Sequence, residues 1–141
     1  MSYKSQAENI LVKRAISPQN ETGDSALVSQ IIDTKGYGSV SFVIATGSLA
    51  DANATFTVLV EDGDDASLTD NAEVSDTFLI DTETNASFNY DNDDKVRWIG
   101  YVGKKRYVRL TITPSGNSGD AYISAVAILG DPESKPVTMN P

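Results

Sequence analysis

The sequence is poor in the side chains that enzymes use for chemistry. It contains no histidine and no cysteine, so it lacks the commonest general base, imidazole metal ligands and thiolate nucleophiles. Ser-His-Asp and Cys-His catalysis are therefore excluded. The Gly36-x-Gly38 and Gly116-x-x-Gly119 spacings lack the remaining positions of a phosphate-binding or dinucleotide-binding loop. We expect no catalytic site and no cofactor.

Carboxylates are the one abundant class of reactive side chain, with 20 Asp and Glu against 11 Lys and Arg. A two-carboxylate glycosidase is compatible with this composition, because it needs only two acids flanking a sugar cleft. No pair stands out, however. Acids in solvated turns stay ionised, whereas a catalytic acid needs surroundings that raise its pKa.

Two acidic turns, Asp62–Asp65 and Asp91–Asp94, carry oxygen ligands of the kind that calcium prefers. With Asp62 at the first position of an EF-hand loop, the sixth position is Ser67 instead of the required glycine. The spacing therefore fails, and we interpret both turns as solvated loops without a metal.

The formal net charge of −9 makes a phosphate backbone a repelled partner, so we expect no binding to nucleic acid. No apolar run approaches the ~18 residues of a membrane span, and the first residues lack a secretory pattern. We expect a soluble protein that is made in the cytoplasm and binds no membrane.

Apolar residues alternate with polar ones at period two, which is typical of strands with one buried face. The pattern predicts an all-β fold, an eight-stranded antiparallel sandwich or jelly roll with extended termini. We expect an N-terminal arm over residues 1–7, the sandwich over 8–130, and an extended Pro-rich tail over 131–141, since its three prolines forbid a helix. The expected strands are 10–16, 26–33, 39–44, 55–60, 74–81, 95–102, 107–113 and 121–129.

Residues 95–113 are expected to form a hairpin, and its register decides which side chains are buried. A two-residue turn at Gly103-Lys104 puts Ile99 on the core face, together with the charged Arg97 and Arg106. A three-residue loop, Gly103-Lys104-Lys105, instead pairs Trp98 with Leu110, and we prefer it because it leaves fewer charges inside. It buries Val96, Trp98, Val102, Val108, Leu110 and Ile112, and leaves Ile99 as the one misfit. The alternation also places two further sets of side chains in the core: Val40, Phe42 and Ile44 in one strand, and Phe56, Val58 and Val60 in the next.

The preferred register gathers tyrosine and arginine side chains on the outside of this hairpin, beside a basic turn. Both residue types are enriched at binding hot spots, which favours a partner interface. Tyrosine pairs across strands also stabilise a bare sheet surface, so both interpretations stay open. The candidate interface is Arg97, Tyr101, Lys104, Lys105, Arg106, Tyr107 and Arg109.

Four stretches carry a resemblance to a known family: Ile10–Arg14; Ala26–Asp33 before a Gly-Tyr-Gly turn; Val96–Leu110 with its Gly-Lys-Lys loop; and a last strand followed by the Pro-rich tail. In these the chain resembles the small jelly-roll cement, or decoration, proteins of tailed bacteriophages. The resemblance implies a non-enzymatic homo-oligomer without a cofactor. It would sit on the outer surface of the virion and bind the major capsid protein of an HK97-like shell.

Two other functions stay open. A carbohydrate-binding β-sandwich module would use Tyr101 and Tyr107 as a platform for sugar rings, although the single tryptophan, expected in the core, counts against it. A small carboxylate glycosidase is the third candidate.

The failed calcium spacing leads to a direct prediction. Millimolar calcium and EDTA should each leave the melting temperature of the protein unchanged, because a true site at a hundred times its Kd would add about 2.7 kcal/mol. Thermal unfolding followed by circular dichroism checks this. A rise of several degrees with calcium would contradict our interpretation of the acidic turns.

Overall fold

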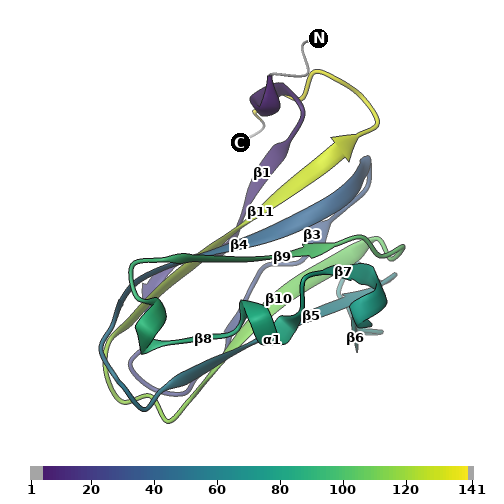
Figure 1. Cartoon of the computed structure of the whole chain (residues 1–141). Coiled ribbons are helices and arrows are strands. Elements are labelled where there is room, and N and C mark those ends of the chain that lie inside the picture. The colour runs from purple at the N-terminus through teal and green to yellow at the C-terminus, as the bar shows by residue number, and fades with distance from the viewer. Residues whose placement is uncertain (1–4, 140–141) are drawn as a thin grey trace.

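The computed structural model describes residues 5–139 and consists of two antiparallel sheets packed face to face (Figure 1). One sheet has five strands in the order β1-β11-β4-β9-β7. The other has six strands along β2-β10-β5-β6, with β3 also pairing with β10 and β8 with β5. The predicted all-β antiparallel sandwich is therefore confirmed.

The five-stranded sheet contains β1 (Leu11–Asn20), β4 (Tyr37–Leu49), β7 (Leu79–Ile80), β9 (Val96–Tyr101) and β11 (Ala121–Pro132). The six-stranded sheet contains β2 (Leu27–Val28), β3 (Ile32–Asp33), β5 (Thr55–Gly63), β6 (Ala72–Glu73), β8 (Phe88–Asn89) and β10 (Tyr107–Ser115). Single helical turns are η1 (Gln6–Glu8), η2 (Asp76–Phe78), α1 (Glu83–Ala86) and η3 (Tyr90–Asn92). None of these described helices is long and apolar enough to cross a membrane.

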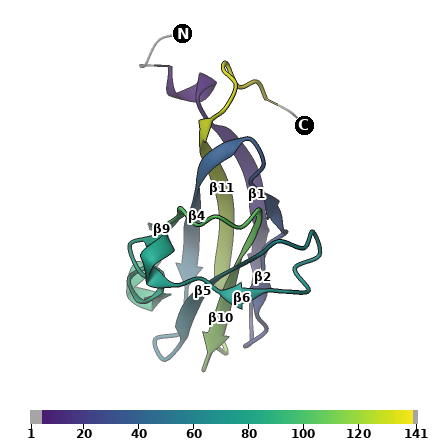
Figure 2. The ribbon, with the colours of Figure 1, turned by 90° about the vertical axis from the view of Figure 1, so that its right-hand side faces the viewer.

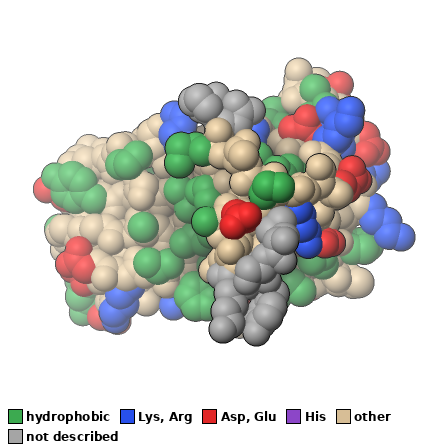
Figure 3. All heavy atoms as spheres, turned by 90° about the horizontal axis from the view of Figure 1, so that it is seen from above, with side chains coloured by type: hydrophobic (Ala, Val, Ile, Leu, Met, Phe, Trp, Pro, Cys, Tyr) green, Lys and Arg blue, Asp and Glu red, His purple; other side chains and the backbone are tan. Residues whose placement is uncertain are grey.

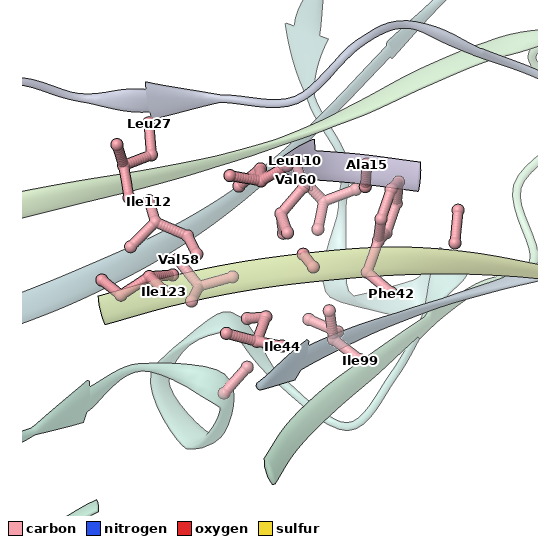
Figure 4. Close-up of a cluster of buried hydrophobic side chains, with 14 of the residues drawn as sticks. Ala15, Leu27, Phe42, Ile44, Val58, Val60, Ile99, Leu110, Ile112 and Ile123 are labelled. Carbon is pink, nitrogen blue, oxygen red and sulfur yellow. The ribbon is translucent and has the colours of Figure 1, made fainter. Parts of the chain in front are cut away.

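The core lies between the sheets and is built from one phase of each long strand. Side chains of β4 and β9 point toward side chains of β5 and β10, as Figure 4 shows for Phe42, Ile99, Val60 and Leu110. Each of these four is at most 2% exposed. Burying such a side chain contributes about 1.5–3 kcal/mol. The predicted core residues that the structure confirms are Val40, Phe42, Ile44, Phe56, Val58, Val60, Val108, Leu110 and Ile112.

Strands β9 and β10 lie in different sheets, so the predicted hairpin is wrong in both registers. β9 pairs with β4, where Ile99 lies opposite Phe42, and β10 pairs with β5, where Leu110 lies opposite Val60. The segment 102–106 therefore crosses from one sheet to the other. Two strands joined by a short segment need not pair, because in a sandwich each can bury its apolar face on the other sheet.

This topology exchanges the two faces that we expected for β9. Ile99 and Tyr101 are buried, at 0% and 2% exposed, because pairing with β4 turns them toward the core. Trp98, Val96 and Val102 are 63%, 49% and 41% exposed, so their predicted burial is wrong. The predicted outward position of Tyr101 is wrong for the same reason.

The long strands β1, β4 and β11 extend past the six-stranded sheet, and the chain enters and leaves at this end (Figures 1 and 2). β11 continues to Pro132, opposite Tyr37, two residues into the expected tail. Proline is tolerated there because β1 begins opposite Leu129, so among residues 5–139 no strand flanks Pro132 on that side. Beyond it, the Val137 amide donates to the Glu8 carbonyl oxygen at 2.7 Å. Residues 1–4 of the expected arm lie outside the described residues.

A pair of neighbouring substitutions tests this register. Ile99→Ala should lower the free energy of unfolding by about 2–5 kcal/mol, because it removes a buried side chain. Trp98→Ala should lower it by less than about 1 kcal/mol, because its side chain is mostly exposed. Urea unfolding is measured at two protein concentrations, because any contribution from association would make the stability depend on concentration. A larger loss for Trp98→Ala would show that the hairpin register holds instead.

Candidate interaction surfaces

The candidate interface residues do not lie together on one sheet surface. Arg97 is in β9 of the five-stranded sheet, whereas Tyr107 and Arg109 are in β10 of the other. Lys104, Lys105 and Arg106 are exposed on the segment that crosses between the sheets. Tyr101 is buried, so it contacts the protein's own interior.

Three of the candidate cations are paired with carboxylates of the same chain. Lys105 Nζ lies 2.9 Å from Asp64 Oδ2, and Arg109 Nη2 lies 3.1 Å from Glu61 Oε1. Arg106 donates to both carboxylate oxygens of Asp33, each at 2.8 Å. Much of the basic cluster is therefore neutralised locally, which weakens the case for an electrostatic partner at the basic turn.

The Asp33–Arg106 pair links β3 to the start of β10. The hydrogen bonds from Arg106 hold the pKa of Asp33 at about 2, well below its usual 3.8. The Arg106 guanidinium also lies over the Tyr107 ring, 5.0 Å from its centroid. These contacts account for Arg106 and Tyr107 structurally, without a partner.

Tyr101 anchors the segment that crosses between the sheets. Its hydroxyl donates to Asp62 Oδ2 at 2.7 Å and accepts from the Lys105 amide at 3.1 Å. Burial and the Asp62 carboxylate both raise the pKa of Tyr101. A side chain at position 103 would meet the Tyr101 ring and hydroxyl within about 2.6 Å, so Gly103 is required there.

The surface with the strongest interaction character is the outward side of the five-stranded sheet. Val126, Val43 and Trp98 stand in one row across three adjacent strands. In the next row, Ile80 of β7 lies opposite Gly100 of β9. The Ile80 side chain occupies the space that a side chain at position 100 would need. We call this surface the outer face and define it by Val43, Ile80, Val96, Trp98, Tyr122 and Val126.

The outer face is free of charged side chains at its centre. None of the outward positions on β4 (39, 41, 43, 45, 47), β9 (96, 98, 100) or β11 (122, 124, 126, 128, 130) is charged. Arg14 stands at its edge, opposite Val126. In Figure 3 hydrophobic side chains lie among uncharged ones over the left half of the view, and most acidic and basic side chains lie on the right and along the rim, with one acidic side chain near the centre beside the grey atoms. The outward side of β5 and β10, by contrast, carries the Arg109–Glu61 pair and threonines.

A second apolar surface lies at the end of the strand extension. We call it the terminal tip; it is lined by Ala7, Ile10, Leu11, Val12, Thr138 and Met139 around a hollow of about 210 Å³. Val12 is 53% and Met139 95% exposed. Among residues 5–139, seven of the eleven exposed large hydrophobic side chains belong to the outer face or the terminal tip.

A polar hollow of about 300 Å³ borders Trp98 at the edge of the outer face. Its polar lining comes from Asp81, Asn85 and Arg97. The side-chain amide of Asn85 donates to Asp81 Oδ1 at 2.7 Å, and Arg97 donates to the backbone carbonyl oxygen of Asn85. An exposed indole beside carboxylate, amide and guanidinium groups has the chemistry to stack on and hydrogen-bond a sugar.

Several carboxylates accept hydrogen bonds from backbone amides. Asp70 accepts from the amides of Asp64 and Asp65 within the first acidic turn. Glu83 Oε2 accepts from the Val60 amide at 2.6 Å and caps the edge of β5; burial raises the pKa of Glu83, and Glu73 adds to this shift. Within residues 5–139 no group of three or more acidic residues is placed to hold a metal ion.

The outer face escaped our sequence reasoning, although the sequence contains a signal for it. The middle of β4 and part of β11 are apolar in both phases, with Val43 between Phe42 and Ile44, and Val126 between buried alanines. A strand that is apolar in both phases is typical of a sheet covered on both sides. Here one side is covered by the other sheet, and the second side is open.

No protein-family model and no curated protein sequence matches the chain. Among solved structures, it is similar to the CBM22-1–GH10 modules of the endo-1,4-β-D-xylanase 10B of Clostridium thermocellum, complexed with xylohexaose. The TM-score is 0.40 and the identity 11%, covering 95% of this chain and 28% of that one. The chain thus spans little more than a quarter of that protein, and a similarity at this level establishes neither a shared family nor a shared ligand.

The Asp33–Arg106 pair gives a pH-dependent prediction. Because the pKa of Asp33 is depressed, its stabilisation is present above about pH 4 and is lost as the pH falls through about 2. Both side chains are about 40% exposed, so solvent screening limits the pair to about 0.2–1 kcal/mol. Asp33→Asn should be less stable than wild type by this amount at pH 7 and equal to it near pH 2. Urea unfolding across this range checks it, and a constant difference would contradict the assignment.

Proposed function

We propose that this protein is a non-enzymatic virion structural protein, a cement or decoration protein. It binds the outer surface of an icosahedral phage head built from an HK97-like major capsid protein. One observation carries the proposal: an acidic domain concentrates its exposed apolar side chains on the outer face and the terminal tip. A domain with one apolar side and one charged, solvated side is suited to binding the surface of a larger assembly.

The composition of the outer face favours a protein partner. Contiguous exposed apolar patches mark interaction sites, and their burial contributes about 25 cal/mol per Å². Four of its six members are aliphatic: Val43, Ile80, Val96 and Val126. Aliphatic side chains pack well against other proteins, whereas sugar rings stack on flat aromatic ones.

Two adjoining apolar surfaces, the outer face and the terminal tip, also fit the work of a cement protein, which must touch more than one neighbour. A clamp that bridges subunits binds only the assembled shell, so mass action stabilises that shell. The net charge of −9 supports a position outside the head, because it disfavours contact with packaged nucleic acid.

A carbohydrate-binding module is the second candidate, and the exposure of Trp98 favours it. We expected this tryptophan in the core, which counted against sugar binding; it is instead 63% exposed beside the Asp81–Asn85 hollow. The expected Tyr101/Tyr107 platform does not exist, because Tyr101 is buried. A sugar would therefore meet a single indole ring.

Sedimentation with shells that lack the protein tests the proposal. Wild-type protein should pellet with the shells and raise their melting temperature. Deleting Glu133–Pro141 removes one wall of the terminal tip and should lower occupancy by about tenfold or more, equivalent to about 1.4 kcal/mol. The sandwich should stay folded, because the deleted residues follow the last strand.

A matched control changes the opposite side of the domain. Thr113→Lys alters an exposed position of β10 and should leave shell binding unchanged. The same proteins are applied to immobilised glycans. Binding to glycans without binding to shells would sink the cement proposal and support the carbohydrate-binding module.

A further inference from the structure

We propose that the outer face binds a second copy of this chain, in a twofold arrangement that packs the two five-stranded sheets against each other. This deepens the proposed function, in which the protein acts as a homo-oligomer. It also assigns the two apolar surfaces different partners: the outer face meets a copy, and the terminal tip is left for the shell.

The distribution of charge favours pairing through the outer face. Each copy carries a net charge of −9, so two copies repel each other over most orientations. The central outward positions of β4, β9 and β11 carry no charge, so two outer faces can meet without placing like charges in contact. A strongly charged partner, by contrast, would find nothing there to pair with.

The relief of the outer face also suits a second copy. Small residues alternate with larger ones on this face: Ser41 and Ala45 flank Val43 along β4, and Ser124 lies between Tyr122 and Val126 along β11. Large side chains of one sheet can therefore insert over the small ones of its copy, as the inner faces of a sandwich interdigitate. A twofold interface uses the same patch on both partners and closes at two copies.

The area of the outer face is large enough for a weak dimer. The strands β11, β4 and β9, with about six residues along each, and the two residues of β7 beside them give a patch of about 20 Å by 20 Å in projection. The accessible area of side chains standing on a sheet exceeds this projection. Two copies would thus bury about 1,200 Å² in total, near the lower limit for a specific interface. We expect a dissociation constant in the micromolar range.

The pairing leaves the terminal tip free. The tip adjoins the outer face, since Val12 of β1 lies opposite Ile128 of β11, but neither Val12 nor Met139 belongs to the four strands that would pair. A pair of copies therefore still exposes two tips for contacts with a shell.

The test uses the full chain and its single tryptophan. Sedimentation equilibrium at about 100 µM should give twice the mass of the 15.1 kDa chain. Dilution below the dissociation constant should shift Trp98 emission to longer wavelength and make it accessible to acrylamide. Val126→Lys should weaken pairing by about 100-fold or more, because it buries a charge in an apolar contact. Thr113→Lys, an equal charge change on the other sheet, should pair like wild type.

Three results would overturn the proposal: a monomer at about 100 µM with Trp98 accessible, a dimer that Val126→Lys leaves intact, or a trimer. The dilution measurement on wild-type protein decides the matter even if Val126→Lys does not fold. Shell sedimentation separates this inference from the proposed function. A monomer that binds shells contradicts only the pairing, and a dimer that ignores shells contradicts only the cement function.

Discussion

Ile99 of β9 lies opposite Phe42 of β4, and much of what we infer about this molecule depends on that pairing. Because side chains alternate along a strand, the same register turns Tyr101 into the core and Trp98 toward solvent. A slip by one residue would exchange them. Tyr101 then reaches Asp62 on the other sheet and holds the crossing segment 102–106, which leads β10 to its place beside β5. One strand register thus sets both the link between the sheets and the character of the outer face.

The molecule separates apolar surface from charge. The Asp64, Asp33 and Glu61 carboxylates lie on the six-stranded sheet and its loops, where they pair with basic side chains of the same chain. The centre of the outer face carries no charge. Electrostatics therefore keeps copies apart wherever the acidic loops would meet, and the hydrophobic effect favours contact on the outer face. Such a division suits a domain that assembles with one side and remains soluble through the other.

Much of the fold could be predicted from the alternation of apolar residues. It indicated the sandwich and placed Phe42, Val58 and Leu110 in the core. It failed at β9, where the segment 96–102 is apolar in both phases and periodicity alone does not choose a face. Because we assumed that the strands of segment 95–113 pair as a hairpin, we wrongly predicted that Trp98 is buried and Tyr101 exposed. That register left the apolar Ile99 on the exposed face, which already indicated that the register was wrong. The expected grouping of the candidate interface residues on one face was wrong for the same reason, and sequence does not reveal that Arg106 and Arg109 have acidic partners distant in the chain.

The central claim is that the outer face and terminal tip are covered by protein in the working state. Hydroxyl-radical footprinting of the free protein at nanomolar concentration and of the decorated shell reads both sides of the domain in one measurement. Our account predicts strong protection of Trp98, Ile80 and Met139 on the shell. Val28, which is 54% exposed on β2 of the other sheet, should be labelled equally in both states. Equal labelling of Trp98 and Ile80 in the two states would contradict it.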